Sequence, residues 1–402
     1  MESTYFRRGF GLKKEIEGDL SRDYASALVE QMRAGDYTLV RGPLTFRLAK
    51  EFGFCYGVDR AVDYAYESRR KFPDRRLILV GEIIHNPHVN DNLRAMGITI
   101  LAHDPDRPFD FSGITGQDVV IMPAFGVTIE DFKRLRDTGA VLVDTTCGSV
   151  LNVWKRVESY ARDGFTSLIH GKHWHEETKA TASQTARHPD GKYLVVLDMA
   201  EATPVLDFIR DGGSDADAMA LGEKFAKAVS PGFDFTRDLA RIGVANQTTM
   251  LSGESLAIAA AFGEALAARY GAEHAAEHFR SFDTICSATQ ERQDAVEALL
   301  AESPDVMIVV GGYNSSNTCH LAELSELKGA RTYHIADADC LDPATGTIRF
   351  QPVGAKMEAT ETGWLRDARR IGLTAGASTP NNKIGETVLR ICETAGVDAS
   401  RP

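Results

Sequence analysis

Short runs of apolar and β-branched residues alternate with amphipathic helical patterns along this chain from residue 44 onward. The predicted strands are residues 76–81, 118–123, 140–144, 166–170, 193–197, 241–245, 305–310 and 370–375. Strands that alternate with helices in this way are typical of βαβ units, in which neighbouring strands run parallel. The pattern therefore predicts an α/β fold with mostly parallel sheets.

Two segments depart from this alternation. Residues 1–43 are charged and irregular apart from one amphipathic stretch around residues 24–32, and we expect them to form an N-terminal accessory extension. Residues 198–238 carry the sequence Asp-Gly-Gly-Ser-Asp-Ala-Asp and a Ser-Pro-Gly turn, which favour loops. We expect this second segment to be a surface insertion.

Length and charge restrict the class of protein. The 402 residues suffice for two or three domains with cores of their own. The formal net charge of −12 argues against binding to nucleic acid. No apolar run is long enough to span a bilayer and no signal peptide opens the chain, so we expect no membrane association and a cytoplasmic location.

Three of the six cysteines, Cys55, Cys147 and Cys286, share one local setting. Apolar or β-branched residues precede each of them, small residues follow, and a helical pattern begins just beyond. This pattern predicts a turn between a strand and a helix. The N-terminus of a helix offers unpaired backbone N–H groups and a partial positive charge, which favour the thiolate over the thiol. Cys319, Cys340 and Cys392 lack this setting.

The wide spacing of the three cysteines means that they belong to different structural units, consistent with three similar α/β modules around one centre. The chain has no Cys-x-x-Cys motif, which argues against zinc ribbons and thioredoxin-like redox pairs. Three thiolates that converge would instead hold an iron–sulfur cubane in which one iron lacks a protein ligand. The alternative is that three buried cysteines merely lie near turns.

Polar residues gather where the predicted strands end. His173, His175 and Glu177 are compatible with a zinc site, or with a histidine that binds an anion while the glutamate manages a proton. Residues 315–317, Ser-Ser-Asn, precede a helix expected to begin near His320, and they suit either a phosphate cradle or an ordinary N-cap. Neither a P-loop nor a Gly-x-Gly-x-x-Gly motif occurs, so we expect a small phosphorylated ligand rather than a nucleotide.

Taken together, these motifs closely resemble the 4-hydroxy-3-methylbut-2-enyl diphosphate reductase family, in its longer branch from photosynthetic lineages. The resemblance keeps the order of the motifs from about residue 44 to the end. The motifs are residues 53–61 (Gly-Phe-Cys-Tyr-Gly-Val-Asp-Arg-Ala), 82–86 (Glu-Ile-Ile-His-Asn), 144–147 (Asp-Thr-Thr-Cys), 175–177 (His-Glu-Glu), 246–249 (Asn-Gln-Thr-Thr), 285–286 (Ile-Cys), 314–317 (Asn-Ser-Ser-Asn) and 374–378 (Thr-Ala-Gly-Ala-Ser).

The resemblance implies a trefoil of three αβα modules around a central [4Fe-4S] cluster. Cys55, Cys147 and Cys286 would be its ligands, and one iron would have no protein ligand. The modules implied are residues 57–147, residues 148–283 with the insertion, and residues 44–56 together with 284–402.

The resemblance also implies a substrate site. Thr248 and Glu177 would lie beside the hydroxyl group that leaves. Where common bacterial members have a histidine, this chain has Phe125, so Lys172 or Lys179 would compensate for the missing contact. The residues implied to bind the diphosphate are His85, His175, Ser315, Ser316, Asn317 and Ser378.

The implied reaction is the reductive dehydroxylation of an allylic diphosphate to isopentenyl and dimethylallyl diphosphates, the last step of the non-mevalonate isoprenoid pathway. No flavin or nicotinamide motif is present, so the electrons would come from an external one-electron donor such as ferredoxin or flavodoxin. Three other functions fit some of the motifs: a hydro-lyase that uses the open iron without net redox change, a non-enzymatic iron–sulfur sensor, and a zinc hydrolase built on His173, His175 and Glu177.

The cysteine assignment predicts two groups of variants. Cys55→Ser, Cys147→Ser and Cys286→Ser should each abolish activity and lose most of the brown colour of the protein, because each removes one thiolate ligand. Cys319→Ser, Cys340→Ser and Cys392→Ser are the matched controls and should keep both. Iron and sulfide analysis of anaerobically purified variants checks this, and equal loss of iron in the two groups would contradict the assignment.

Overall fold

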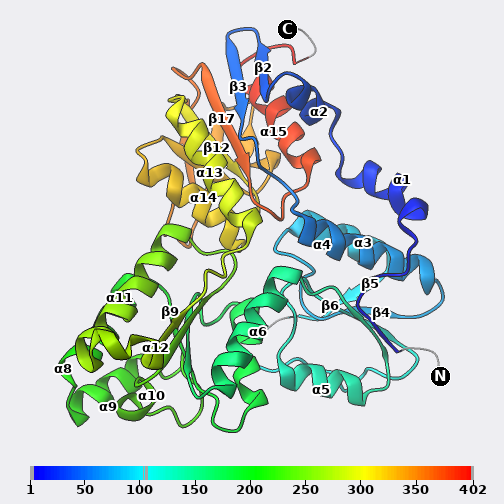
Figure 1. Cartoon of the computed structure of the whole chain (residues 1–402). Coiled ribbons are helices and arrows are strands. Elements are labelled where there is room, and N and C mark those ends of the chain that lie inside the picture. Colours follow the sequence, from blue (N-terminus) through cyan, green and yellow to red (C-terminus); the bar gives the residue numbers. More distant parts are fainter. Residues whose placement is uncertain (1–3, 103, 105–106, 400–402) are drawn as a thin grey trace. The chain divides into compact units, whose positions relative to one another are not determined.

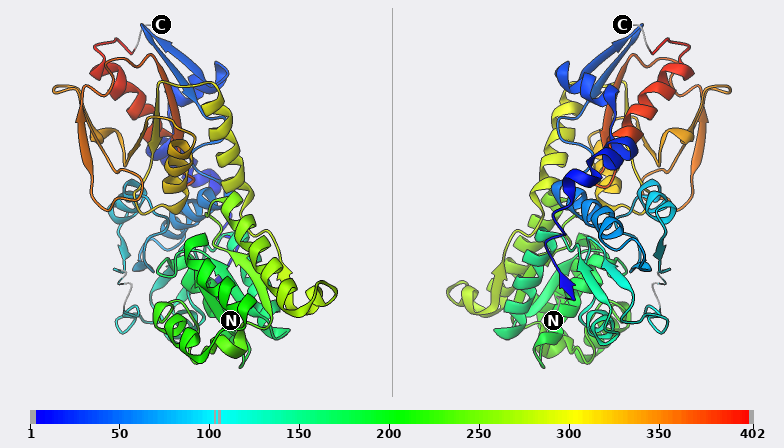
Figure 2. Two further views of the ribbon diagram at one scale, coloured as in Figure 1. Left: turned by 90° about the vertical axis from the view of Figure 1, so that its left-hand side faces the viewer. Right: turned by 90° about the vertical axis from the view of Figure 1, so that its right-hand side faces the viewer.

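The computed structural model describes residues 4–102, 104 and 107–399, and the chain divides into two compact units (Figures 1 and 2). The first unit comprises residues 1–7, 75–81 and 101–286. The second unit comprises residues 8–74, 82–100 and 287–402.

The first unit is built on two parallel sheets. Its strands are β1 (Tyr5–Phe6), β4 (Leu77–Leu79), β6 (Val119–Met122), β7 (Val141–Asp144), β8 (Thr166–His170), β9 (Tyr193–Val196), β10 (Ile242–Asn246) and β11 (Phe279–Ser281). In one sheet the neighbours follow the order β1-β7-β6-β4, and in the other β11-β10-β8-β9. All these pairs are parallel.

Helices follow most of these strands, as expected of βαβ units. They are α5 (Ile129–Asp137), α6 (Gly148–Arg162), α7 (Glu176–Ser183), η1 (Gln184–Arg187), α8 (Met199–Asp211), α9 (Asp215–Lys224), α10 (Phe235–Asp238), α11 (Ser252–Tyr270), η2 (Ala272–His274) and α12 (Ala275–His278). The long helix α11 lies beside α8 (Figure 1). Side chains of both helices pack on Leu168 of β8 and Val244 of β10.

The second unit contains one larger, mostly parallel sheet with the strand order β13-β12-β17-β3-β2 and a small antiparallel sheet. Its strands are β2 (Thr38–Arg41), β3 (Leu44–Leu48), β5 (Ile98–Ile100), β12 (Val306–Val310), β13 (Thr332–Ile335), β14 (Leu341–Asp342), β15 (Thr347–Phe350), β16 (Ala359–Thr362) and β17 (Arg370–Ala375). Within the larger sheet only the pair β2–β3 is antiparallel. Strands β14, β15 and β16 form the small sheet.

The second unit contains several helices, some of which cover both faces of its larger sheet. They are α1 (Lys13–Tyr24), α2 (Ala27–Ala34), α3 (Tyr56–Lys71), α4 (Pro87–Ala95), α13 (Ser287–Ala301), α14 (Ser316–Leu327), η3 (Ala338–Cys340) and α15 (Asn381–Thr394). Figure 1 shows α13 and α14 on one side of β12 and β17, and α15 on the other. Alternate residues of β12 follow this division, because Ile308 belongs to the core that includes α15, whereas Val309 packs with α13 and α14. A strand buried on both faces reads as a continuous apolar run, which explains the sequence Val-Met-Ile-Val-Val.

The sequence predictions for the strands are confirmed. Each of the eight predicted segments overlaps a strand, namely β4, β6, β7, β8, β9, β10, β12 and β17, and only β10 extends beyond its segment, by one residue. The helix expected near His320 begins earlier, because Ser315 is the N-cap and α14 starts at Ser316. Most strands that the pattern did not predict are short, lie at sheet edges or belong to the small antiparallel sheet. Strand β3 is the exception, because it has five residues and lies inside the larger sheet between β17 and β2.

The prediction that residues 1–43 are irregular is wrong. Their described part forms β1, α1, α2 and β2. Strand β1 is only two residues long and pairs with β7, while Ser26 caps α2 by accepting a hydrogen bond from the N–H of Val29. Such a short strand is stabilised by its distant partner and leaves no local signal.

The segment 198–238 is mostly helical, and its first helix is not superficial. Val205, Leu206 and Ile209 of α8 are at most 3% exposed and belong to the core of the first unit. Only the later part, with α9 and α10, carries the Gly- and Asp-rich turn and the exposed Met219. The expected insertion, like the expected boundaries of the accessory extension and the three modules, stays a prediction.

No helix within the described residues is long and apolar enough to cross a membrane.

The close packing of β10 on α6 predicts a contrast between two glycines. A Cβ at Gly243 would lie 2.5–2.6 Å from the ring of Tyr160, a buried residue of α6, whereas a Cβ at Gly253 in the first turn of α11 would meet nothing within 4 Å. Gly243→Ala should destabilise the protein by about 1–3 kcal/mol through overpacking, while Gly253→Ala should be neutral or slightly stabilising. Thermal unfolding followed by circular dichroism checks this, and equal midpoints for the two variants would contradict it.

Candidate active site

The three cysteines singled out by the sequence all lie at helix N-termini. Cys55 is the N-cap of α3, Cys147 is the N-cap of α6, and Cys286 immediately precedes α13. All three are half-buried. Cys147 follows the end of β7 closely, as expected, but Cys55 and Cys286 stand several residues beyond the ends of β3 and β11. The N-terminal setting stabilises a thiolate, and soft thiolates suit iron–sulfur clusters.

In the first unit a chain of hydrogen bonds joins a glutamate to a cysteine. The backbone N–H of Thr248 donates to Oε1 of Glu177 over 2.6 Å, and the Thr248 hydroxyl donates to Oε2 over 3.1 Å. The carbonyl oxygen of Thr248 accepts from the backbone N–H of Cys286 at 3.2 Å. Both oxygens of the Glu177 carboxylate are thus held in place. The side chains of Glu177 and Thr248 come from the start of α7 and the loop after β10, and the residues are 2% and 4% exposed.

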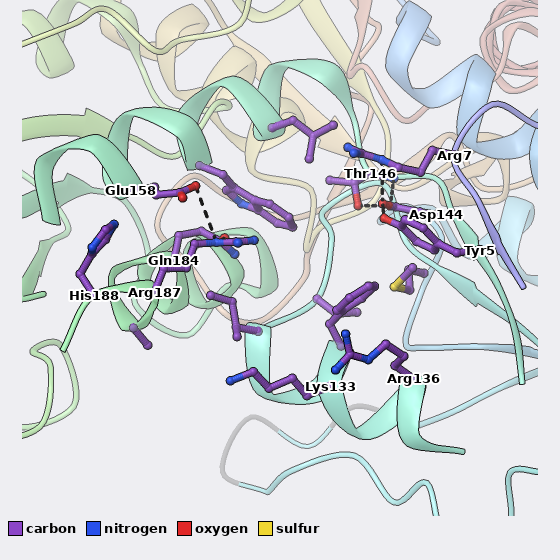
Figure 3. A pocket seen from close by; sticks show the side chains of 17 residues that line it. Tyr5, Arg7, Lys133, Arg136, Asp144, Thr146, Glu158, Gln184, Arg187 and His188 are labelled. Atoms are coloured by element: carbon purple, nitrogen blue, oxygen red, sulfur yellow. Dashed lines mark hydrogen bonds and ion pairs between the residues drawn. The ribbon is translucent and has the colours of Figure 1, made fainter. Parts of the chain in front are cut away.

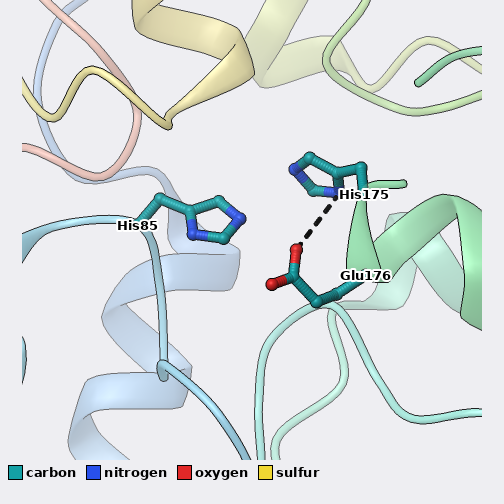
Figure 4. Close-up of side chains that lie close together, drawn as sticks. All are labelled: His85, His175 and Glu176. Carbon is teal, nitrogen blue, oxygen red and sulfur yellow. Dashed lines mark ion pairs between the residues drawn. The ribbon is translucent and has the colours of Figure 1, made fainter. Parts of the chain in front are cut away.

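His175 extends this chain. It is the N-cap of α7, and its Nδ1 accepts a hydrogen bond of 3.1 Å from the backbone N–H of Glu177. Since Nδ1 acts as an acceptor there, the neutral imidazole carries its proton on Nε2, which becomes the donor. The carboxylate of Glu176 lies 4.0 Å from the same Nδ1 (Figure 4).

Phe125 lies beside His175. Its ring packs edge-on against the imidazole of His175, with the ring centres 5.6 Å apart. The preceding residue, Ala124, accepts a hydrogen bond of 2.9 Å from the backbone N–H of Cys147. The loop after β6 therefore positions Cys147 and presents an aromatic side chain, as expected of the longer branch, where common bacterial members of the family have a histidine.

In the second unit the loops after β12 and β17 form a cradle of polar groups at the starts of α14 and α15. The Ser378 hydroxyl donates within 3.2 Å of Oγ of Ser315 and 3.3 Å of the carbonyl of His85. The Asn317 Oδ1 accepts from the N–H of Ala377 at 2.8 Å, but the buried Nδ2 of Asn317 has no hydrogen-bond partner among the described residues. A buried N–H group without a partner is costly, so this amide is suited to bind an anionic ligand.

The cradle is joined to Cys55. The backbone N–H of Cys55 donates to the carbonyl of Ala377 at 3.3 Å, and the N–H of Gly53 donates to the carbonyl of Ala375. The guanidinium of Arg292, which is 3% exposed on α13, donates to the carbonyl of Gly53 at 2.7 Å. Cys55 and the groups around Asn317 therefore share one rigid loop assembly.

Glu82 is a site residue to which the sequence assigned no role. Its Oε2 lies 2.9 Å from Nδ1 of His85 and accepts a hydrogen bond of 3.2 Å from the Asn314 amide. This carboxylate fixes the orientation of His85 and favours a proton on its Nδ1. The spacing of three residues between Glu82 and His85 was the only signal for the pair, and such a spacing is common without function.

The zinc alternative gains no support from the geometry. Within the described part of the chain, His173, His175 and Glu177 do not bring three ligand atoms within reach of one ion. His173 instead packs edge-on against Trp174, and burial lowers the pKa of His173. The Nδ1 of His175 is already engaged by the N–H of Glu177.

Comparisons with known proteins give a consistent result. The family model described as "LytB protein" matches residues 46–392. A protein of Gloeobacter violaceus named "4-hydroxy-3-methylbut-2-enyl diphosphate reductase" is 48% identical over 99% of this chain and 94% of its own length. A protein of the same name from Thermosynechococcus vestitus is 47% identical over 96% of this chain and 94% of its own length.

Two solved structures are similar in fold. One, titled as the structure of (E)-4-hydroxy-3-methyl-but-2-enyl diphosphate reductase, the terminal enzyme of the non-mevalonate pathway, has a TM-score of 0.51 and 28% identity, and covers 87% of this chain and 99% of its own. The other, the E-1-hydroxy-2-methyl-but-2-enyl-4-diphosphate reductase from Plasmodium falciparum, has a TM-score of 0.62 and 20% identity, and covers 86% of this chain and 87% of its own. The expected α/β fold class is confirmed.

The unpartnered amide of Asn317 predicts a binding defect. Asn317→Ala should weaken the binding of inorganic diphosphate about tenfold or more, because a hydrogen bond to a charged group contributes about 1.5–3 kcal/mol. Ser325→Ala, at the opposite end of the same helix, is the control and should bind normally, since among the described residues the Ser325 hydroxyl bonds only to the carbonyl of Leu321. Calorimetric titration measures both affinities, and unchanged binding by Asn317→Ala would place the anion elsewhere.

Proposed function

The chain belongs to the LytB protein family, and from this premise we propose that it reduces 4-hydroxy-3-methylbut-2-enyl diphosphate to isopentenyl and dimethylallyl diphosphates. The family resemblance seen in the sequence, including its branch, is confirmed by these relatives, which are cyanobacterial. The single observation in the fold that carries the proposal is the chain of hydrogen bonds from Glu177 through Thr248 to Cys286. These hydrogen bonds link a carboxyl group to a candidate metal ligand through Thr248, which supports a role of Glu177 in proton transfer.

Cys55, Cys147 and Cys286 are the residues that would hold a [4Fe-4S] cluster with one iron lacking a protein ligand. Their half-buried positions at helix N-termini support this assignment, because such positions stabilise thiolates and restrict the access of solvent. When bound, the cluster supplies a Lewis acid for the hydroxyl oxygen and relays electrons. Side chains of the protein bind the diphosphate and provide the proton.

The diphosphate is bound by polar groups at helix N-termini. Asn317 offers its unpartnered Nδ2, and the hydroxyls of Ser315 and Ser378 already face one another across the cradle. Ser316, in the first turn of α14, supports this loop. His85, oriented by Glu82, and His175 supply further donors. The positive ends of the helices stabilise the anion.

Glu177 holds the proton that the leaving hydroxyl needs. The reaction consumes two electrons and two protons: the allylic C–O bond breaks, the hydroxyl leaves as water, and the carbon skeleton gains one hydrogen. In the ionised state Glu177 accepts from both donors of Thr248. When Glu177 is protonated, the Thr248 hydroxyl can accept that proton and pass on its own, because a hydroxyl both donates and accepts.

The half-buried aromatic ring of Phe125, packed edge-on against the imidazole, limits the access of water to His175. Lys172 and Lys179 are the candidates to replace the histidine contact that Phe125 removes.

An external one-electron carrier, ferredoxin or flavodoxin, would deliver the two electrons. A cytoplasmic location stays a prediction.

The proton assignment predicts a separation of binding from turnover. Glu177→Gln keeps the size of the side chain but carries no acidic proton, so turnover should fall about a hundredfold or more while the substrate still binds. Turnover is measured anaerobically with a one-electron reductant, as the formation of isopentenyl and dimethylallyl diphosphates. Substrate binding is read from the electron paramagnetic resonance signal of the reduced cluster.

The matched control is Glu67→Gln. Glu67 is also buried, and its carboxylate accepts from the backbone N–H groups of Phe10 and Leu12, but it belongs to no part of the proposed site. Its variant should turn over normally. Near-normal turnover by Glu177→Gln would remove Glu177 from the proton path. Turnover of the unaltered protein without any reductant would instead indicate a hydro-lyase.

A further inference from the structure

A cavity of about 590 Å³ lies in the first unit between α5, α6 and η1 (Figure 3). The N-terminal residues Tyr5 and Arg7 close one side of it. None of the residues to which the proposed reaction assigns a role lines this cavity. Its size is that of an ordinary small-molecule site.

The floor of the cavity is apolar. Met122, Val127, Ile129 and Leu151 line it together with the aromatic rings of Phe132 and Trp154. The indole Nε1 of Trp154 is buried and has no hydrogen-bond partner among the described residues. An apolar floor with a single unpartnered donor favours a ligand with a hydrocarbon body.

The rim is cationic, and part of its charge is not neutralised. Arg7 pairs with Asp144 at 3.5 Å, and Arg187 pairs with Glu158 at 3.7 Å. Lys133 and Arg136 project from α5 at the same rim, and neither forms an ion pair with any described residue. In a protein whose net charge is −12, two unpaired cations beside an apolar cavity are selective for an anion.

We infer that this cavity binds an amphiphilic anion, a hydrocarbon chain that ends in a phosphate or a carboxylate. The chain lies on the floor formed by Val127, Leu151 and Trp154, and the anionic head lies at Lys133 and Arg136. Alkyl or isoprenoid phosphates and fatty acids share this chemistry.

The cavity is a neighbour of the candidate active site rather than a part of it. Asp144, which lines the cavity, accepts hydrogen bonds from the Tyr5 hydroxyl at 2.6 Å and from the backbone N–H of Thr146 at 3.0 Å. Thr146 directly precedes Cys147. A ligand in the cavity therefore contacts the segment that leads into a candidate cluster ligand, without occupying the proposed substrate site.

Calorimetric titration of the anaerobic holoprotein tests the inference. The probes are octyl phosphate and octanoate below their micelle-forming concentrations. Inorganic phosphate, which has the charge but no hydrocarbon chain, and octanol, which has the chain but no charge, are the controls. Saturating inorganic diphosphate is present throughout, to fill the proposed substrate cradle. We expect the two amphiphiles to bind, and inorganic phosphate and octanol to bind at least tenfold more weakly. Tighter binding of octyl phosphate than of octanoate would identify a phosphate head, and the reverse a carboxylate.

Matched double variants locate the site. The double variant Lys133→Ala with Arg136→Ala should bind the amphiphiles at least tenfold more weakly than the unaltered protein. Lys155→Ala with Arg162→Ala, which removes two exposed cations of α6 that do not line the cavity, should leave binding unchanged. Absence of binding to the unaltered protein would overturn the inference. Equal losses of affinity for the amphiphiles in the two double variants would also overturn it. The same holds if inorganic phosphate or octanol binds as tightly as the amphiphiles.

Discussion

The unpaired backbone N–H groups at helix N-termini are the constraint on which the candidate active site depends. Cys55, Cys147, His175 and Ser315 are all N-caps, and Cys286 directly precedes a helix. In parallel sheets these helix starts follow the carboxyl ends of the strands, where α/β proteins bind their ligands. One arrangement of the backbone thus stabilises thiolates and provides donors for a diphosphate.

The parts of this arrangement that depend on local sequence could be predicted. Each core strand, such as β12, is a short apolar run between turn residues. The small residues after Cys147 and Cys286 mark the starts of helices that the structure then contains. Local propensity and periodicity suffice for such elements because their signals lie within a few residues. The local pattern around His175 offered a proton role for Glu177 only as one of two alternatives. The family resemblance favoured that role and added Thr248, to which no local pattern assigns a role.

The parts that depend on distant partners could not be predicted. Strand β1 has two residues and exists because β7 offers it an edge. The amide of Asn317 is oriented by the backbone N–H of Ala377, and Thr248 bonds to Glu177 in the first turn of α7. These contacts follow from the packing of whole loops, so neither partner carries a signal in its own neighbourhood. The cationic cavity beside Asp144 arises in the same way, because it needs the N-terminal segment, α5, α6 and η1 together.

The most direct measurement is Mössbauer spectroscopy of the protein loaded anaerobically with ⁵⁷Fe. Three cysteine ligands and an open iron predict that about a quarter of the iron has a distinct spectrum, and that only this fraction changes when 4-hydroxy-3-methylbut-2-enyl diphosphate is added. Four equivalent irons that do not respond to the substrate would contradict the cluster assignment. Zinc in place of iron would contradict it as well.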